Sequence, residues 1–159
     1  MTAGPDSIPN YSVVLFPVAF VLFWIFICLV ISVMSGWRAL AESFIQQSKP
    51  CGQIKTAGPF FHVVYMRYWC HYSSVIRMTA ADDAFYLSVL AIFRAGHPPL
   101  RIPWNEIHFV KISRYGSRFV VLTLGNREAI PMRISERMAR NLGILDRMAN
   151  HESQAQLRS

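Results

Sequence analysis

The stretch VVLFPVAFVLFWIFICLVI, residues 13–31, decides the architecture of this 159-residue chain. It contains no charged residue. A bilayer core of about 30 Å requires roughly 20 apolar residues in helical form, a length that this run reaches with its immediate neighbours. Tyr11 and Trp37 bracket the run, where amphipathic rings favour the membrane interface. We therefore predict a transmembrane helix over residues 11–35.

Two other interpretations of an apolar run are a buried helix of a soluble core and a cleaved signal peptide. The length of the run and its lack of charge disfavour the buried helix. A signal peptide has a basic start and a shorter apolar segment. Because the first ten residues, MTAGPDSIPN, contain no Lys or Arg, we expect an uncleaved signal anchor.

Basic residues lie on one side of this run only. All 16 Lys and Arg follow it, as do all but Asp6 of the nine Asp and Glu, which gives the following segment a net charge of +8. The positive-inside rule predicts a short extracytoplasmic tail, residues 1–10, and a cytoplasmic C-terminal part. Such a charge suits an anionic leaflet or an acidic protein partner. We expect no nucleic acid partner, because the basic residues are spread over many strands without an aromatic stacking platform.

The segment after the anchor, residues 36–59, changes character twice. SGWRALAESFIQQSK has helical spacing of apolar residues and predicts a short amphipathic helix, which lies on the interface, packs against the domain or continues the anchor. KPCGQIKTAGP then reads as a linker or an irregular entry strand. The cysteines, Cys28, Cys51 and Cys70, are odd in number and irregularly spaced, which fits a reducing compartment.

The composition after Phe60 favours short β-strands. We predict seven, at residues 61–68, 74–79, 84–93, 100–103, 107–113, 118–124 and 127–134. Gly125-Asn126 is a two-residue hairpin signal. Pro131 suits an edge strand or a bulge.

The period then changes to that of a helix. Ser135 can cap it, and one apolar face comprises Met138, Leu142, Leu145 and Ala149. A polar tail, residues 151–159, follows. We therefore predict an N-terminal single transmembrane α-helix plus a small mainly-β domain over residues 60–150. This domain is a barrel or sandwich of about seven strands, capped by a C-terminal α-helix.

Two segments of the chain resemble known proteins. AFYLSVLAIFRAGHPPLRIPWNEI, residues 84–107, and SGWRALAESF, residues 35–44, are similar to a group of small bacterial membrane-anchored proteins of uncharacterised function. The order of seven strands and a helix resembles the pleckstrin-homology-like superfold, including its bacterial and GRAM-type versions. The resemblance covers roughly residues 36–148 and implies a fold and a bacterial inner membrane. It implies no activity, because the superfold hosts lipid binding, peptide binding and scaffolding.

One departure from that superfold bears on ligands. Members that bind phosphoinositides carry several basic residues around the first two strands. Here that region reads YMRYWCHYSSVIR, with only Arg67 and Arg77. We therefore do not expect specific phosphoinositide binding.

The usual catalytic and cofactor motifs are missing from the sequence. His62, Cys70 and His71 lack the spacing of a zinc site, and adjacent strand residues point to opposite faces. No G-x-S-x-G, P-loop or G-x-G-x-x-G motif occurs. Asp82 and Asp83 are typical of a turn. We expect no catalysis, no metal and no cofactor.

The best candidate for a contact surface is a basic hairpin. Lys111, Arg114 and Arg118 flank the turn that contains Tyr115, and Arg101 is expected nearby. An aromatic residue among cations can contact anionic headgroups or an acidic partner. A solvated turn of a basic domain has the same composition.

A second candidate is the proline-rich loop at residues 94–99. It contains His97, and rigid exposed loops often recognise partners. A plain connector is the alternative. Trp104 in IPWNEI is expected to pack against the barrel edge.

Two functions follow from these features. The first is a membrane-anchored, non-catalytic interaction or scaffold module that binds a protein partner at the inner membrane. The alternative is a peripheral lipid-binding domain that reads anionic headgroups through the basic hairpin. The small number of basic residues near the first strands favours the first.

Overall fold

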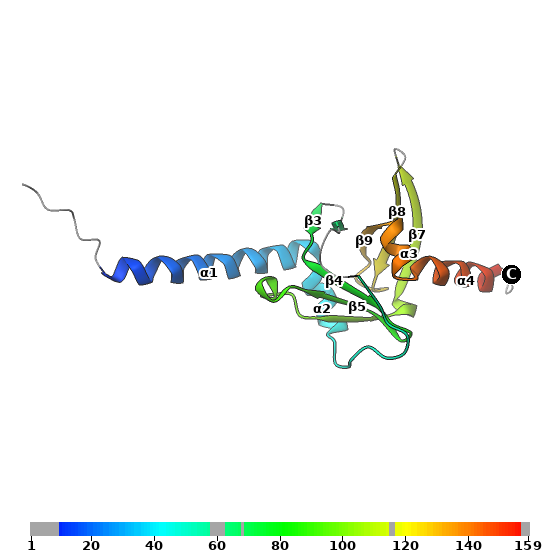
Figure 1. Ribbon diagram of the computed structural model, residues 1–159, viewed down its shortest axis with the longest axis horizontal. Helices are drawn as coiled ribbons and strands as arrows, with labels where there is room; N and C mark the ends of the chain where they lie inside the picture. The colour runs from blue at the N-terminus through cyan, green and yellow to red at the C-terminus, as the bar shows by residue number, and fades with distance from the viewer. Residues whose placement is uncertain (1–9, 58–62, 68, 115–116, 157–159) are drawn as a thin grey trace, which may run out of the picture.

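The computed structural model describes residues 10–57, 63–67, 69–114 and 117–156 of the chain. A long helix, α1 (Asn10–Ser35), extends from one side of a β domain, and a second long helix leaves on the opposite side (Figure 1). Val14–Ser35 is long and apolar enough to cross a membrane, and only 6% of its most apolar window is buried. This exposure argues against a buried core helix. The predicted apolar helix is therefore present.

Helix α2 (Trp37–Phe44) follows α1 after a single residue, Gly36, whose φ is 81°. The amphipathic helix thus neither continues α1 nor lies apart from the domain, since Trp37 and Leu40 are buried in the core. The expected interfacial position of Trp37 is wrong. Its indole N–H donates to the carbonyl of Pro98 over 2.9 Å, inside the domain.

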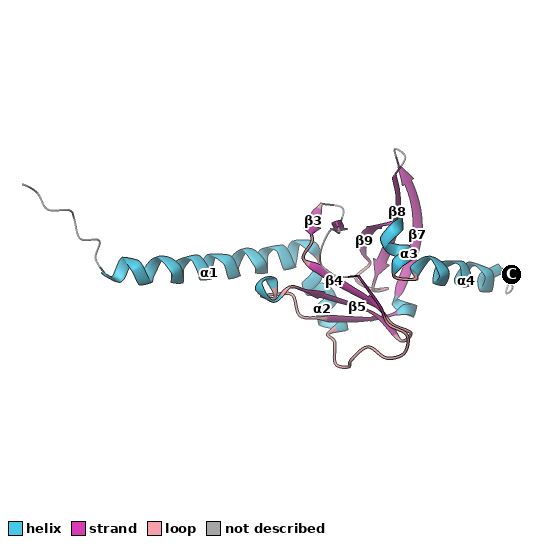
Figure 2. Cartoon of the chain, viewed as in Figure 1, coloured by secondary structure: helices cyan, strands magenta, loops and turns pink. Residues whose placement is uncertain are grey.

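Within the described residues, nine strands rather than the seven predicted form two antiparallel sheets. Figure 2 shows the strands of the β domain beside the helices. The four-stranded sheet has the order β1-β4-β5-β6, with bounds Lys55–Ala57, Ile76–Ala80, Ala84–Val89 and Leu100–Pro103. The five-stranded sheet has the order β3-β2-β9-β8-β7, with bounds Cys70–Ser73, Val63–Met66, Ile130–Ser135, Ser117–Leu124 and Ile107–Arg114. The additional strands are β1, inside the segment predicted to be a linker or an irregular entry strand, and β3. With three and four residues, β1 and β3 carry little alternation that would distinguish them from loops.

Other predicted boundaries changed because of local backbone geometry. The predicted third strand ends at Val89, and Ala91–Phe93 form a 3₁₀ turn, η1. A second such turn, η2 (Trp104–Glu106), precedes β7. The connection from β8 to β9 takes five residues rather than two, and it begins at Gly125 with a φ of 75°.

Pro131 lies in β9, a central strand that pairs with β8 one residue to one residue, so neither the predicted edge strand nor the predicted bulge is observed there. It is accommodated where the neighbouring strand β2 ends. Its carbonyl accepts from the N–H of Arg67, the residue that follows β2, and the ladder between β2 and β9 pairs only Tyr65 and Met66. The missing N–H of the proline therefore lies beyond the paired part of β2.

The predicted C-terminal helix is two helices, α3 (Glu136–Asn141) and α4 (Ile144–Gln156). Ser135 caps α3 as expected, because its hydroxyl accepts from the N–H of Met138 over 3.3 Å. Gly143, with a φ of 70°, separates the two helices. Met138 and Leu142 are buried in the core between the sheets.

Candidate functional site

The structure divides the six predicted contact residues among three places. Lys111 and Arg118 are exposed on the β7–β8 hairpin, and Arg118 lies 3.8 Å from the Glu136 carboxylate. Arg114 ends β7, while Tyr115 lies outside the described residues. The hairpin extends sideways from the domain, across the direction of α1 (Figure 1).

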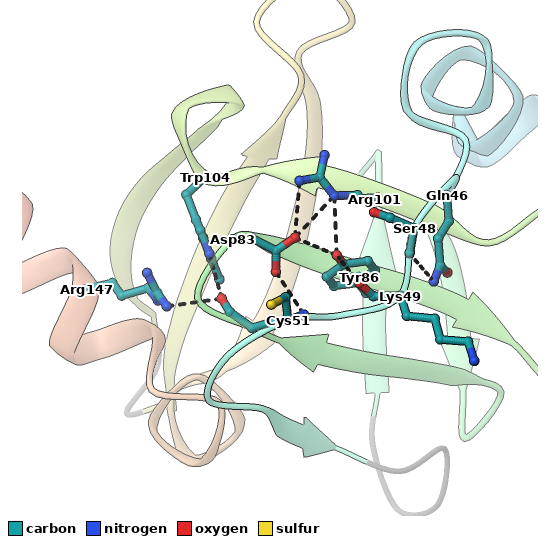
Figure 3. A network of polar contacts seen from close by, with 10 residues as sticks. Gln46, Ser48, Lys49, Cys51, Asp83, Tyr86, Arg101, Trp104 and Arg147 are labelled. Carbon is teal, nitrogen blue, oxygen red and sulfur yellow. Dashed lines mark hydrogen bonds and ion pairs between the residues drawn. The ribbon is translucent and has the colours of Figure 1, made fainter.

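Arg101 belongs to β6, in the other sheet, and forms part of a polar cluster (Figure 3). Its guanidinium lies 3.1 Å from the Asp83 carboxylate, which also accepts from the Tyr86 hydroxyl over 2.7 Å. The Tyr86 hydroxyl, the Cys51 N–H and Arg101 hold the pKa of Asp83 below its usual value. Because Asp83 accepts from the backbone of Cys51 over 3.3 Å, the cluster fastens the segment before β1 to the sheet. It gives Arg101 a structural role.

Trp104 packs at the edge of the core, as expected. Its indole N–H donates to the carbonyl of Ala81 over 2.8 Å, and its ring contacts Phe85 and Phe109. The guanidinium of Arg147 stacks on the same ring, with Cζ 4.4 Å from the centroid. The contact joins α4 to the β domain.

His97 is buried and does not form part of an exposed loop. Its Nε2 lies 3.0 Å from the Tyr72 hydroxyl, which in turn lies 2.8 Å from Oγ of Ser35, at the end of α1. Nδ1 lies 3.0 Å from the carbonyl of Ala95, which can only accept, so Nδ1 carries the proton of the neutral ring. Burial lowers the pKa of His97 and raises that of Tyr72 to about 12. Both groups are therefore neutral near pH 7.

A cavity of about 350 Å³ lies beside this cluster, between α1 and the β domain. Cys28, Ile31 and Met34 line it from α1, and Val75, Val89 and Phe93 line it from the domain. Its wall is mostly apolar. The cavity is at the lower end of the size range of small-molecule sites and suits an apolar group.

The outer face of the five-stranded sheet is a surface that the sequence analysis missed. The Arg133 guanidinium carbon lies 4.5 Å from the ring centroid of Tyr65 and 4.8 Å from that of Phe119. On the same face, Val110 and Ile112 of β7 are 52% and 40% exposed. The sequence signal was the run HFVKI, which places apolar residues on both faces of one strand.

Metal coordination finds no support in the described parts of the chain, where no group of three His, Cys, Asp or Glu side chains converges. The Cys70 side chain packs against the hydrophobic core, whereas the His71 side chain lies on the outer face of the five-stranded sheet, where it stacks on Tyr65. His62 lies outside the described residues.

No family model, curated protein or solved structure matches the chain.

Proposed function

We propose that this protein is a membrane-anchored, non-catalytic interaction module whose β domain binds an extended segment of a protein partner along β7. The observation that carries the proposal is the β7 edge of the five-stranded sheet, where no further strand among the described residues pairs with β7. β7 is eight residues long, ends that sheet, and exposes Val110 and Ile112 beside Lys111. An edge strand presents unpaired backbone groups to which a peptide can add as another strand.

The other sheet edges are less suited to this role. β1 and β3 have three and four residues. β6 has four, and Ile45 after α2 bridges to its first residue, Leu100. Among the described edges, β7 alone offers the length that an added strand needs.

Charge defines the partner segment. The segment after the anchor carries +8, and Lys111 and Arg118 are exposed on the hairpin. A second copy of the chain would bring like charges together. We therefore infer an acidic strand with apolar residues at alternate positions, whose apolar side chains pack on Val110 and Ile112.

The membrane setting supports the same proposal. α1 is long enough to span a bilayer, and the positive-inside rule favours the cytoplasmic side for the basic domain. The resemblance to small bacterial membrane-anchored proteins implies that this membrane is a bacterial inner membrane. We also propose that the domain is a divergent pleckstrin-homology-like fold. Two antiparallel sheets followed by a helix support this assignment. The nine strands and the interruption at Gly143 are departures from it.

Headgroup binding through the basic hairpin is the alternative. Because β7 and β8 extend across the direction of α1 rather than along it, headgroup binding by the hairpin has less support (Figure 1). In the protein-binding proposal, by contrast, β7 stays accessible to a partner beside the anchor.

The test uses the full chain in lipid nanodiscs and a labelled eight-residue peptide that alternates Glu and Val. Fluorescence anisotropy measures its affinity for the wild type, Lys111→Glu and Arg77→Glu. Arg77 is an exposed strand residue of the other sheet and provides the matched charge control. We expect Lys111→Glu to weaken binding at least about tenfold and Arg77→Glu less than about threefold, because only the first charge lies on the β7 edge.

Equal losses for both variants, or no binding to the wild type, would contradict the proposal. Hydrogen exchange at residues 107–124, without peptide, separates the alternative. Protection that appears only when anionic lipid replaces neutral lipid would assign the hairpin to headgroups.

A further inference from the structure

The turn η1 packs along α1 well before the end of that helix. The indole N–H of Trp24 donates to the carbonyl of Ile92 over 3.0 Å, and the Trp24 and Phe93 rings lie 5.3 Å apart. Figure 1 shows this turn reaching back beside α1, away from the rest of the β domain. From these contacts we propose that residues 90–93 are inserted among the lipid acyl chains of the membrane that α1 spans.

The position of Trp24 sets the depth of η1. A spanning segment of roughly 20 residues must lie between Asn10 and Ser35, so it ends between residue 29 and Ser35. At 1.5 Å per residue, Trp24 then lies about 8–16 Å inside the apolar layer. Ile92 is held at the same level by its bond to Trp24. Every placement of the helix that covers the apolar layer therefore takes η1 into it.

Several backbone groups of Leu90 and η1 have hydrogen-bond partners within the protein. The carbonyls of Leu90 and Ala91 accept from the N–H groups of Phe93 and Arg94 over 2.9 and 3.2 Å. The carbonyl of Ile92 accepts from Trp24, and the N–H of Leu90 donates to Val75 over 3.1 Å. Irregular backbone enters the hydrocarbon region only where such groups have partners. Trp24 thus supplies, from inside the apolar run, the donor that Ile92 requires.

The side chains of η1 fit the same environment. Ile92 is 65% exposed and lines an apolar hollow with Phe20, Val21 and Trp24. This surface is continuous with the exposed apolar surface of α1. Because lipid chains would surround that surface of α1, we infer that they also cover Ile92. Arg94 follows and is exposed, and its long side chain can reach the headgroups.

The chain then returns toward the cytoplasmic end of α1. The Ser32 hydroxyl donates to the carbonyl of Gly96, and Gly96 lies against Leu29 and Ser32 so closely that a Cβ would meet Leu29 at 2.9 Å. Two further contacts therefore hold the returning segment against α1. The inference rests on α1 crossing the membrane and does not depend on the partner proposed for β7.

Site-directed spin labelling of the full chain in phosphatidylcholine and phosphatidylglycerol nanodiscs tests the proposal. Nitroxides at Ile92→Cys, Val21→Cys, Leu29→Cys and Asn126→Cys, with the native cysteines replaced by serine, report collision with oxygen and with a nickel chelate. Val21 and Leu29 calibrate depth on α1, and Asn126 is an exposed loop control. We expect the label at position 92 to resemble those at 21 and 29, with nickel collisions at least about fivefold fewer than at position 126.

Two results would overturn the proposal. One is nickel access at position 92 equal to that at 126, while position 21 stays protected. The other is low access to both reagents together with dipolar broadening that unlabelled protein removes, which would place a second copy there. If position 21 is itself open to nickel, α1 does not span, and the premise fails rather than the loop alone.

A second variant separates the depth of the turn from folding. Trp24→Phe keeps the ring but removes the donor to Ile92. We expect greater nitroxide mobility at position 92 and an unchanged circular dichroism melting curve. Unchanged mobility would show that this hydrogen bond does not hold the turn.

Discussion

The β domain is closed by helices on two sides that differ in chemistry. On the side of α3, the buried residues are Met138, Ala139 and Leu142, whose side chains carry no ionisable group. On the side of α1 and α2, the buried Trp37 packs with Tyr72 and His97. The three buried polar residues among those described, Ser32, Ser35 and His97, all lie on this second side. The difference shows that one side depends on apolar packing, while the other also needs its hydrogen-bond partners in place.

The largest expected effect is on the apolar side. Leu142→Asp would put a carboxylate among buried apolar side chains, and we expect at least about 4 kcal/mol of destabilisation. Chemical denaturation of the full chain in micelles, followed by near-ultraviolet circular dichroism, measures this. Asn141→Asp, on the exposed neighbouring residue, should cost less than about 1 kcal/mol. An unchanged chemical denaturation curve for Leu142→Asp would rule out this packing.

Removal of the largest side chain on the α1 side should have a comparable but smaller effect. Trp37 is fully buried, so Trp37→Ala should destabilise the domain by about 3–4 kcal/mol in the same assay. Trp69, which is 67% exposed, provides the control, and Trp69→Ala should cost less than about 0.5 kcal/mol. Similar values for the two would show that α2 does not close the domain in solution.

The hydroxyl of Tyr72 tests the polar part of that side. Tyr72→Phe removes contacts to Ser35 and His97 but keeps the ring, and we expect a loss of about 1–2 kcal/mol in the same denaturation measurement. Tyr65→Phe, on the outer sheet face, should change stability by less than about 0.5 kcal/mol. If the two substitutions are equivalent, the polar cluster contributes no net stability.

The smallest effect is a pH dependence confined to the α1 side. Because burial lowers the pKa of His97, the unfolded chain binds a proton before the folded one as pH falls through about 6.5. Stability should therefore be constant above about pH 7.5 and decline toward pH 5.5. In denaturation measured across that range, His97→Gln should flatten the slope, whereas His71→Gln, at an exposed position, should retain it. A slope unaffected by His97→Gln would contradict burial of a neutral ring.

The same two sides differ in how far the sequence predicted them. The cap at Ser135 and the burial of Met138 and Leu142 follow from spacing within one segment, and they were predicted. The contacts among Trp37, Tyr72 and His97 join residues far apart in the chain, and no local pattern predicts them. Trp37 at the end of an apolar run has the sequence signature of an interfacial residue, while the helical spacing of residues 35–49 left open whether this helix lies on the interface or packs against the domain.

The rest of the fold shows the same division. The predicted ends of β6, β7 and β8 lie within one residue of the observed ends. These strands could be recognised because their alternation of apolar and polar residues is long enough or because proline and glycine bound them. β3 was missed because it is short, and for β1 the sequence left a linker and an irregular entry strand as alternatives. Four of the six candidate contact residues were chosen by charge, which does not indicate that Arg101 pairs with Asp83. Like charge alone therefore does not predict that residues lie on one surface.

Gly36 bears on the height of the β domain above the membrane. A Cβ at this position would lie 2.7 Å from Cδ1 of Ile130 and 2.8 Å from Nε of Arg67, so the one-residue joint is packed on its outer side. If the joint does not swing, β7 stays at one height above the bilayer. A partner tethered in the same membrane would then meet it at an effective concentration set by the length of its own linker. Linkers too short to span that height would be excluded, so this joint would select partners by length as well as by sequence.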